Sequence, residues 1–318
     1  MSELVEKSQV IIVVNPISGG NNKDAFVNTL DRYANLYHFE YKLLLTKGSD
    51  DLMRLRKLIK EVKPSIIIAV GGDGTLLLVA ESIMHTPIKL GIIPFGSANG
   101  MAAELKIPSE HEKAMEVVFT GKSVAIDNLK VDHRYNCIHI GDMGLNAKIV
   151  KRFEEEKQRG FLGYAKQFFR ELPLSRQVRA VIITDTNRYV KGVHMIAFAN
   201  ARRYGTGAIL NPLGQLDDGY FELCIIKSLS FVALLYMLFS VFSGSVYKTR
   251  YAQVIRCKEA NIILRNKKKL TVQVDGEVIG ERSRLHIAIQ HKCLNIIVPN
   301  HTEASFWDAL LAEGIESA

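Results

Sequence analysis

The chain has 318 residues, of which 47% are hydrophobic and 23% are charged. This composition excludes a collagenous or disordered chain, and the length predicts two domains rather than one core. The 41 basic and 33 acidic residues give a net charge of +8, which favours an anionic partner such as a nucleotide, an anionic membrane face or nucleic acid. The four cysteines lack the paired spacing of a zinc site or a redox motif, which favours a reducing compartment.

The first predicted strand covers residues 10–14, an apolar run that is too short for the hydrophobic region of a signal peptide. It leads into a polar turn with glycines that begins at Asn15, and apolar residues at helical spacing predict a helix over residues 26–37. A second strand ends at Leu45. The helix predicted after it, over residues 49–62, has acidic residues in its first turn, which suits the helix dipole.

An apolar run of mainly β-branched residues, 66–70, then leads into Gly71-Gly72-Asp73-Gly74-Thr75. The run predicts a buried strand, because it is too short for a helix, and a helix is expected from Thr75 to Met84. Glycines let another molecule approach the backbone, and the amides of a helix N-terminus attract anions such as phosphate. The Asp73 carboxylate would repel a phosphate unless a metal ion or a hydroxyl lies between them. The alternative is a tight strand-to-helix turn in which Asp73 is a cap.

A fourth strand, over residues 89–93, ends in a loop that runs from Pro94 to Asn99. Alternating strands and helices of this length predict a parallel sheet covered on both faces, a doubly wound α/β domain. Ligands of such sheets bind beyond the carboxyl ends of the strands. The loops that begin at Asn15, Thr46, Gly71 and Pro94 are therefore expected to converge on one edge and to form a binding site.

From residue 123 onward most predicted segments are short strands, which indicates a mainly antiparallel β-sandwich. The predicted strands cover residues 128–131, 136–140, 179–184, 194–199, 221–226, 261–264, 270–274, 285–289 and 294–298. Helical segments are expected at about 147–172 and 229–242, and a last helix, capped by Thr302, is expected to pack on the first domain. The predicted domains are residues 1–127 with 300–318, and residues 128–299.

Residues 231–242 form an apolar segment that is shorter than the ~20 residues needed to span a bilayer. A helix buried in the second domain is favoured here. The alternative is a hydrophobic surface, within residues 229–242, that dips into lipid or lines an acyl-chain channel.

The ordered motifs of the chain resemble those of the bacterial diacylglycerol kinase family over nearly the whole length. In chain order the matching residues are Asn15, Pro16, Ser18 and Gly19; Thr46; Gly71 to Thr75; Pro94, Gly96, Ser97 and Asn99; Asp218 and Gly219; and Asp275, Gly276 and Glu277. Sphingosine kinases, NAD kinases and phosphofructokinases share the central glycine motif. However, the later Asn-x-Asp segment of NAD kinases is not apparent here, and phosphofructokinases lack the sandwich domain.

The resemblance implies a role for each matching residue, with ATP and Mg²⁺ as cofactors. ATP would be bound by Asn15, Pro16, Ser18, Gly19, Thr46, Gly71, Gly72, Asp73, Gly74, Thr75, Gly96, Ser97 and Asn99. Mg²⁺ would be held by Asp218, by the backbone of Gln215 and Tyr220, and by the adjacent Asp217.

Glu277 would be the general base for the lipid hydroxyl, with Asp275 beside it, if this turn projects across the cleft between the domains as the resemblance implies. Asp73 is the rival for the role of base. Its place inside the phosphate loop suits the ordering of a metal ion or a water better.

One position departs from the family pattern, because Gly100 stands where many bacterial diacylglycerol kinases have an Asp. The segment from Gly96 to Gly100 is closer to that of sphingoid kinases, so diacylglycerol, a sphingoid base and ceramide remain alternatives for the lipid. A kinase of a soluble alcohol or nucleotide such as NAD, and a nucleotide-binding protein without turnover, also remain open. We expect a cytoplasmic enzyme that meets its lipid peripherally at the membrane surface, without a nucleic-acid partner, and a homodimer is left open.

Overall fold

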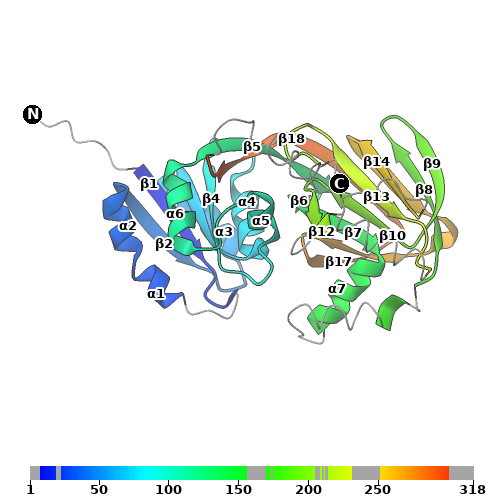
Figure 1. Ribbon diagram of the computed structural model, residues 1–318, viewed down its shortest axis with the longest axis horizontal. Coiled ribbons are helices and arrows are strands. Elements are labelled where there is room, and N and C mark those ends of the chain that lie inside the picture. Colours follow the sequence, from blue (N-terminus) through cyan, green and yellow to red (C-terminus); the bar gives the residue numbers. More distant parts are fainter. Residues whose placement is uncertain are drawn as a thin grey trace, which may run out of the picture. The chain divides into compact units, whose positions relative to one another are not determined.

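The computed structural model describes residues 8–18, 23–155, 170–172, 175–204, 208–209, 211, 214–230 and 251–300 (Figure 1). Contacts divide the chain into two compact units, Met1–Ile126 with Cys293–Thr302, and Asp127–Lys292 with Glu303–Ala318. The divisions after Ile126 and after Lys292 fall inside strands, β5 (Lys122–Val131) and β18 (Arg284–Val298), rather than in linkers. The predicted domain limits, 1–127 with 300–318 and 128–299, stay a prediction.

The first unit is built on a parallel sheet in the order β2-β1-β3-β4, and the last part of β18 pairs with β4. Val14 lies opposite both Leu45 and Val70, and Gly71 lies opposite Pro94, so the four strands end at one level. The predicted convergence of the four loops is therefore confirmed. The strands are β1 (Ser8–Val14), β2 (Phe39–Leu45), β3 (Ile66–Gly71) and β4 (Lys89–Pro94).

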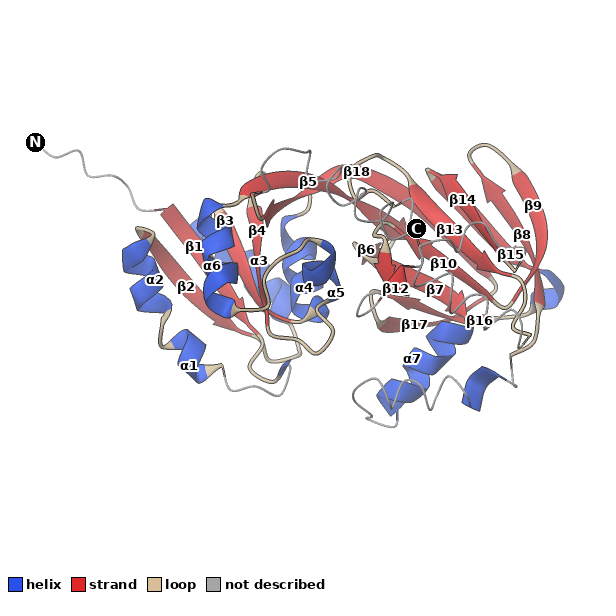
Figure 2. Cartoon of the chain, in the orientation of Figure 1, coloured by secondary structure: helices blue, strands red, loops and turns tan. Residues whose placement is uncertain are grey.

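Helices cover both faces of this sheet, as expected for a doubly wound domain (Figure 2). One face carries α3 and α4, which lie side by side. On the other face α6 packs on β4, and Phe119 of α6 stacks on Tyr37 at the end of α2 with a centroid distance of 4.6 Å. The helices are α1 (Asp24–Val27), α2 (Leu30–Leu36), α3 (Asp51–Val62), α4 (Asp73–Ile83), α5 (Gly100–Glu104) and α6 (His111–Thr120).

The helix predicted over residues 26–37 is in fact two short helices, α1 and α2. The backbone N–H of Thr29 donates to the Phe26 carbonyl at 2.9 Å, and the Thr29 hydroxyl donates to the same carbonyl at 2.6 Å. That carbonyl is the one that a continuous helix would offer to Leu30. A local side-chain bond therefore replaces a helical bond at the break.

The second unit is an antiparallel β-sandwich, as predicted. One sheet joins the first part of β18 to β15, β8 and β9, with β5 and β6 beside it, and the other has the order β14-β13-β10-β7-β16-β17. Ile182 and Ile262 of the first sheet belong to one buried cluster with Phe198, Leu223 and Val272 of the second. Burial of both inner faces therefore holds the two sheets together.

The strands of the second unit, besides β5 and β18, are β6 (Tyr135–Cys137), β7 (Ile140–Gly144), β8 (Val178–Thr184), β9 (Arg188–Val193), β10 (Met195–Ala199), β11 (Arg203–Tyr204), β12 (Ala208–Ile209), β13 (Phe221–Ile226), β14 (Ala252–Cys257), β15 (Glu259–Leu264), β16 (Leu270–Val274) and β17 (Glu277–Arg282). Helix α7 (Leu145–Glu155) follows β7, and a 3₁₀ turn (Arg265–Lys267) follows β15. The four cysteines are buried and free of disulfides.

Two predicted strand boundaries of this unit are wrong. The strand predicted over residues 136–140 is interrupted, because the amides of Ile138 and His139 donate to the Asp275 carboxylate rather than to a neighbouring strand. The strands predicted over 285–289 and 294–298 are one strand, β18, which continues through the left-handed residue Lys292.

The helices predicted over 229–242 and from Thr302 onward lie outside the described residues, except for 229 and 230, as does most of the segment 147–172 beyond α7. The membrane-contact hypothesis for the apolar segment 229–242 lies there too. Within the described part of the chain, no helix has the length and apolar character needed to cross a bilayer.

Candidate active site

Main-chain hydrogen bonds bring the loops at the carboxyl edge of the first unit together. The N–H of Asn15 donates to the Val70 carbonyl at 3.1 Å, and the N–H of Phe95 donates to the Gly71 carbonyl at 2.8 Å. The strand order 2-1-3-4 reverses direction at β1, so the crevice of this sheet lies between the loops that follow β1 and β3. These are the loops that carry Asn15 and the glycine motif.

The loops after β3 and β4 touch through main chain at Gly72 and Gly96. Gly72 has an extended backbone, with φ −97° and ψ −167°, which any residue can adopt. A Cβ on Gly72 would lie 3.1 Å from the Gly96 Cα, and a Cβ on Gly96 would lie 2.4 Å from the Gly72 Cα. Both glycines are therefore required for space rather than for a special backbone conformation.

The N-terminus of α4 fits an anion. Its N-cap residue, Gly72, makes no side-chain capping bond, and the first amides of an α-helix lack the usual helical partners. The Thr75 N–H is the exception in this turn, because it donates to the Gly72 carbonyl at 3.0 Å. A Cβ on Gly74 would meet nothing within 4 Å, so open space lies beside the first turn. The hydroxyl of Thr75 in the same turn is buried without a hydrogen-bond partner in the described structure. These groups fit the phosphates of a nucleotide.

Asp73 anchors the neighbouring loop. Its carboxylate oxygens accept the N–H groups of Gly100 at 3.0 Å and of Met101 at 3.1 Å, the first two residues of α5. The capping interpretation of Asp73 is therefore supported, but the capped helix is α5 and not its own. Since Gly100 has no side chain, Asp73 meets no second carboxylate from that position.

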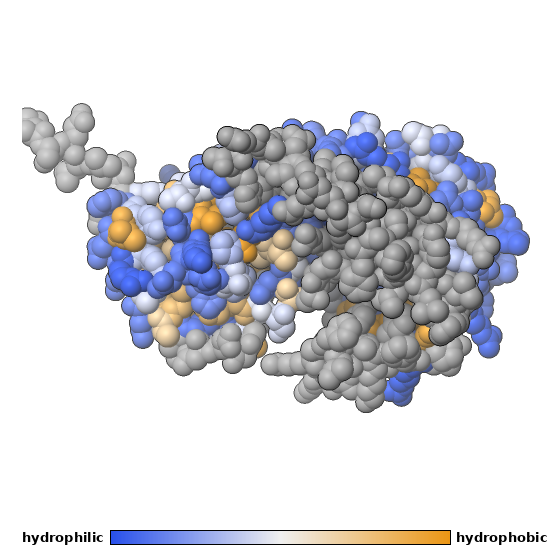
Figure 3. Space-filling model, viewed as in Figure 1, coloured by the Kyte–Doolittle hydropathy of each residue, from blue (hydrophilic) through white to orange (hydrophobic). Residues whose placement is uncertain are grey.

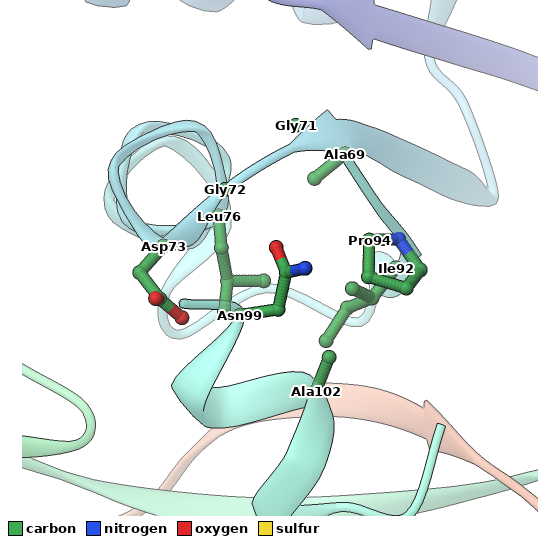
Figure 4. A pocket seen from close by; sticks show the side chains of 9 residues that line it. All are labelled: Ala69, Gly71, Gly72, Asp73, Leu76, Ile92, Pro94, Asn99 and Ala102. Atoms are coloured by element: carbon green, nitrogen blue, oxygen red, sulfur yellow. The ribbon is translucent and has the colours of Figure 1, made fainter. Parts of the chain in front are cut away.

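Asn99 closes the loop after β4 on itself, because its side chain both accepts the Gly96 N–H at 2.7 Å and donates to the Gly96 carbonyl at 2.9 Å. Under the loops lies a cavity of about 10 Å³, which has room for one water. Figure 4 shows Leu76, Ile92 and Ala102 around this cavity, with Asp73 and Asn99 at its side. This cavity is too small for a nucleotide.

Lys23 is a residue of this site that the motifs did not reveal. Its ammonium donates to the Ser18 carbonyl at 2.5 Å and lies 5.4 Å from the centre of the Phe95 ring. The side chain is buried, and burial lowers the pKa of its ammonium. A lone lysine shortly after the glycine turn was its only signal in the sequence.

Of the other predicted residues of this loop, Pro16 is exposed and Gly19 lies outside the described residues.

Aromatic rings fix the start of the loop after β4. His111 stacks on Phe95 with a centroid distance of 3.5 Å, and Phe26 meets Phe95 edge-on at 5.4 Å. Together with Tyr33 and three smaller or polar residues these rings line a pocket of about 320 Å³. The rings bury Phe95, so the glycine loop that follows it starts from a fixed point.

Ser97 is exposed in that loop, and Thr46 is half-buried after β2.

The predicted metal-binding residues lie in the second unit, before β13. One Asp218 oxygen accepts the Tyr220 N–H at 2.9 Å, and the other pairs with Arg256, whose guanidinium lies 4.1 Å from the Tyr220 ring centre. The buried carboxylate of Asp127 fixes this turn by accepting the Gly219 N–H at 2.7 Å.

No group of three or more His, Cys, Asp or Glu side chains that could hold a metal is found among the described residues. The donor set still fits Mg²⁺, which takes one or two carboxylates, carbonyl oxygens and several waters. Asp218 and Asp217 would supply carboxylates, and Gln215 and Tyr220 would supply carbonyls.

Glu222, next to this turn, predicts a pH dependence of stability. Burial raises its pKa from 4.5 to about 7, against the hydrogen bond from Asn211 at 2.6 Å. Because the folded pKa is raised, the folded state holds the proton more tightly, and this contribution to stability is lost as the pH rises from about 4.5 to 7. Glu222→Gln keeps an acceptor for Asn211 and should remove this loss of stability with rising pH, which amounts to about 3 kcal/mol. Urea unfolding at pH 5 and pH 8 measures the free energy of unfolding at each pH. An equal difference between the two pH values in the variant and in the unmodified protein would contradict this assignment.

The predicted base lies at the start of β17. Asp275 and Gly276 both have positive φ, +47° and +89°, and form the two-residue turn of the β16–β17 hairpin. Glu277 follows the turn with an exposed side chain. The Asp275 carboxylate accepts the N–H groups of residues 138, 139 and 140 at 2.8 to 3.1 Å. Asp275 therefore holds the turn in place, and the exposed Glu277 follows it.

Two family models match the two halves of the chain. The diacylglycerol kinase catalytic domain matches residues 9–131, and the YegS C-terminal NAD kinase beta sandwich-like domain matches residues 140–298. A diacylglycerol kinase of Staphylococcus epidermidis is 27% identical over 280 residues, which cover 85% of this chain and 86% of the relative. A diacylglycerol kinase of Staphylococcus aureus is 28% identical over 240 residues, 74% of this chain and 75% of that protein.

A crystal structure of a diacylglycerol kinase from Bacillus anthracis has the same fold. Its TM-score is 0.69 at 16% identity, and the match covers 92% of this chain and 97% of that one. The expected resemblance is confirmed on both domains. The chain belongs to the diacylglycerol kinase family, with its catalytic domain followed by a YegS-type β-sandwich, and is a kinase with an alcohol acceptor.

Proposed function

We propose that this protein transfers the γ-phosphate of ATP to a hydroxyl group of a lipid, diacylglycerol or a related one, with Mg²⁺ as cofactor. The observation that carries the proposal is the open N-terminus of α4, where uncapped amides and the free space beside Gly74 fit the phosphates of a nucleotide. It lies in a domain of the diacylglycerol kinase catalytic type.

In this proposal the first domain binds ATP through the loops after its four strands. The amides at Gly72 to Gly74 receive the phosphates, and Asp73 and Asn99 keep the loops in place through the hydrogen bonds described above. Mg²⁺ would be held by Asp218 and the carbonyls of Gln215 and Tyr220, with Asp217 adjacent. When bound, it neutralises charge on the transferred phosphoryl group.

The second domain supplies the base. A hydroxyl that attacks phosphorus must lose its proton, and an exposed carboxylate on a rigid hairpin can accept it. Glu277 is an exposed carboxylate directly after the hairpin turn, which supports this role. The bonds that Asp275 and Asp73 accept from three and two main-chain N–H groups support a structural role for those two carboxylates. Glu277 is therefore the catalytic residue of the proposal. Asp275 supports the turn before Glu277, and Asp73 supports the loop after β4.

The lipid is reached by peripheral contact with a membrane in this proposal, and nucleic acid has no part in it. The net charge of +8 favours an anionic lipid surface. Ile17, in the loop after β1, is 82% exposed, and Met53 is 68% exposed. On the face drawn in Figure 3 the apolar residues form separate spots among hydrophilic ones, which suits a reversible contact.

The test incubates the protein with labelled ATP, Mg²⁺ and vesicles made from a total lipid extract, followed by identification of the labelled product. A phosphorylated lipid is expected. The identity of that labelled product shows whether diacylglycerol, a sphingoid base or ceramide is the acceptor. Turnover should be higher on anionic than on neutral vesicles and should fall as salt rises. A labelled product only with a soluble acceptor such as NAD would overturn the proposal, and so would ATP binding without any product.

A further inference from the structure

Gln273 lies at the centre of a buried polar chain that ends at the hairpin of Glu277. It is the penultimate residue of β16, is 1% exposed, and lies opposite Asp142 of β7 in the antiparallel ladder. Its amide nitrogen donates to Asp142 Oδ2 at 2.6 Å, and its amide oxygen accepts the Gly276 N–H at 2.8 Å. One side chain therefore connects the β7 strand to the turn that precedes Glu277.

The orientation of this amide is determined at both ends. An ionised carboxylate only accepts hydrogen bonds and a peptide N–H only donates them, so the nitrogen must face Asp142 and the oxygen must face Gly276. No other side chain of this length offers a donor and an acceptor side by side. A Glu would face Asp142 with a second carboxylate, and an apolar residue would make neither hydrogen bond.

Asp142 is itself fixed. It is fully buried, and besides Gln273 it accepts the side-chain amide of Asn146 and the Ala147 N–H, the latter at 2.7 Å. Both residues belong to the first turn of α7, where backbone N–H groups lack helical partners. The chain thus runs from α7 through Asp142 and Gln273 to Gly276. Asp275 holds the same turn independently, through the amides of residues 138–140.

We propose that Gln273 is a positioning residue for catalysis, which sets the place of the Glu277 carboxylate through Gly276. This inference rests on the proposed role of Glu277 as base. Gly276 has φ +89° and no neighbour within 4 Å of the place where a Cβ would lie, so packing does not hold it. The hydrogen bond to Gln273 holds Gly276, in addition to the bonds that Asp275 makes from the first residue of the turn. Displacement of a catalytic group by ~1 Å typically costs ~100-fold in rate.

The test is a double-mutant cycle between Gln273→Met and Glu277→Gln. Methionine matches the length of glutamine but makes neither hydrogen bond. In the natural background Gln273→Met should lower kcat by about 10- to 100-fold with an unchanged KM for ATP. In the Glu277→Gln background the same change should cost less than about twofold, because the group that it positions is already absent.

Thr271→Val is the matched control. Thr271 is a buried polar residue of the same strand that does not touch the turn, and kcat should stay within about twofold of the unmodified protein. If Gln273→Met does not fold, Asp142→Asn weakens the chain from its other end, because only one side-chain oxygen then remains to accept from Gln273, Asn146 and Ala147. The same cycle applies.

The outcomes separate the two proposals. An equal loss of kcat from Gln273→Met in both backgrounds would overturn the positioning role and leave Glu277 as the base. Near-normal turnover of Glu277→Gln alone would overturn the proposed base, and with it this inference.

Discussion

Glu277→Gln should lower kcat on the lipid acceptor by ~10²–10⁴-fold, the typical contribution of a general base, while ATP binding is retained. Glutamine keeps the shape of the side chain but cannot take the proton from the acceptor hydroxyl. Because Glu277 is exposed at the start of β17, the change should leave the sandwich core intact. Steady-state kinetics with the identified lipid, together with calorimetric titration of ATP, measure both quantities.

Glu281→Gln is the control for this variant. Glu281 lies on the same strand, is also exposed, and undergoes the same loss of charge. Its kcat should remain close to that of the unmodified protein. If Glu277→Gln keeps near-normal turnover, the Asp-Gly-Glu segment is a hairpin without a catalytic role, and the base must be sought elsewhere.

Gly72→Val should abolish nucleotide binding with a smaller effect on stability. The Cβ would lie 3.1 Å from the Gly96 Cα and force the loops after β3 and β4 apart. Loss of two hydrogen bonds to a charged phosphate, at about 1.5–3 kcal/mol each, weakens binding by about 100-fold or more. Calorimetric titration of ATP in the presence of Mg²⁺ measures the affinity, and thermal unfolding without nucleotide measures the stability.

Two other glycines make the comparison informative. A Cβ on Gly74 would meet nothing within 4 Å, so Gly74→Ala should keep the stability of the free protein. It should weaken only the affinity for the nucleotide, because the added methyl group enters the space of the nucleotide. A Cβ on Gly91, inside β4, would lie 2.9 Å from the Val118 side chain of α6, so Gly91→Val should lower the unfolding temperature instead. Unchanged ATP affinity in Gly72→Val would refute the placement of the nucleotide at this edge.

The sequence was sufficient to predict the parallel sheet and its binding edge, because both follow from local patterns. A β-branched run predicts a buried strand, and three glycines around Asp73 predict a tight turn at its end. What Asp73 does was not predictable in the same way. Its partners are the N–H groups of Gly100 and Met101, and no pattern near residue 73 shows which backbone groups a carboxylate will meet after folding.

The same limit explains the errors in the second domain. Residues 136–140 have the composition of a strand, and the strand is broken because Asp275, far along the chain, binds the amides of Ile138 and His139. The pair His291-Lys292 has the polarity of a turn, yet β18 continues through it. There the buried Asp127 carboxylate accepts the Lys292 N–H at 2.6 Å. At both places a carboxylate from a distant part of the sequence binds the backbone. Asp275 ends a strand in this way, and Asp127 binds a left-handed residue within β18.

The division of β18 between the two units has a consequence for the order in which the protein is made. The outer neighbour of β4 is the end of β18, where Asn295 pairs with Lys89 and Ile296 with Leu90. On the ribosome β4 therefore remains an open strand edge until residues 127–292 of the second unit have been synthesised. Open edges are sites of aggregation, and domains usually fold from the N-terminus onward. The domain that begins first in this sequence thus waits for most of the second before its sheet is complete.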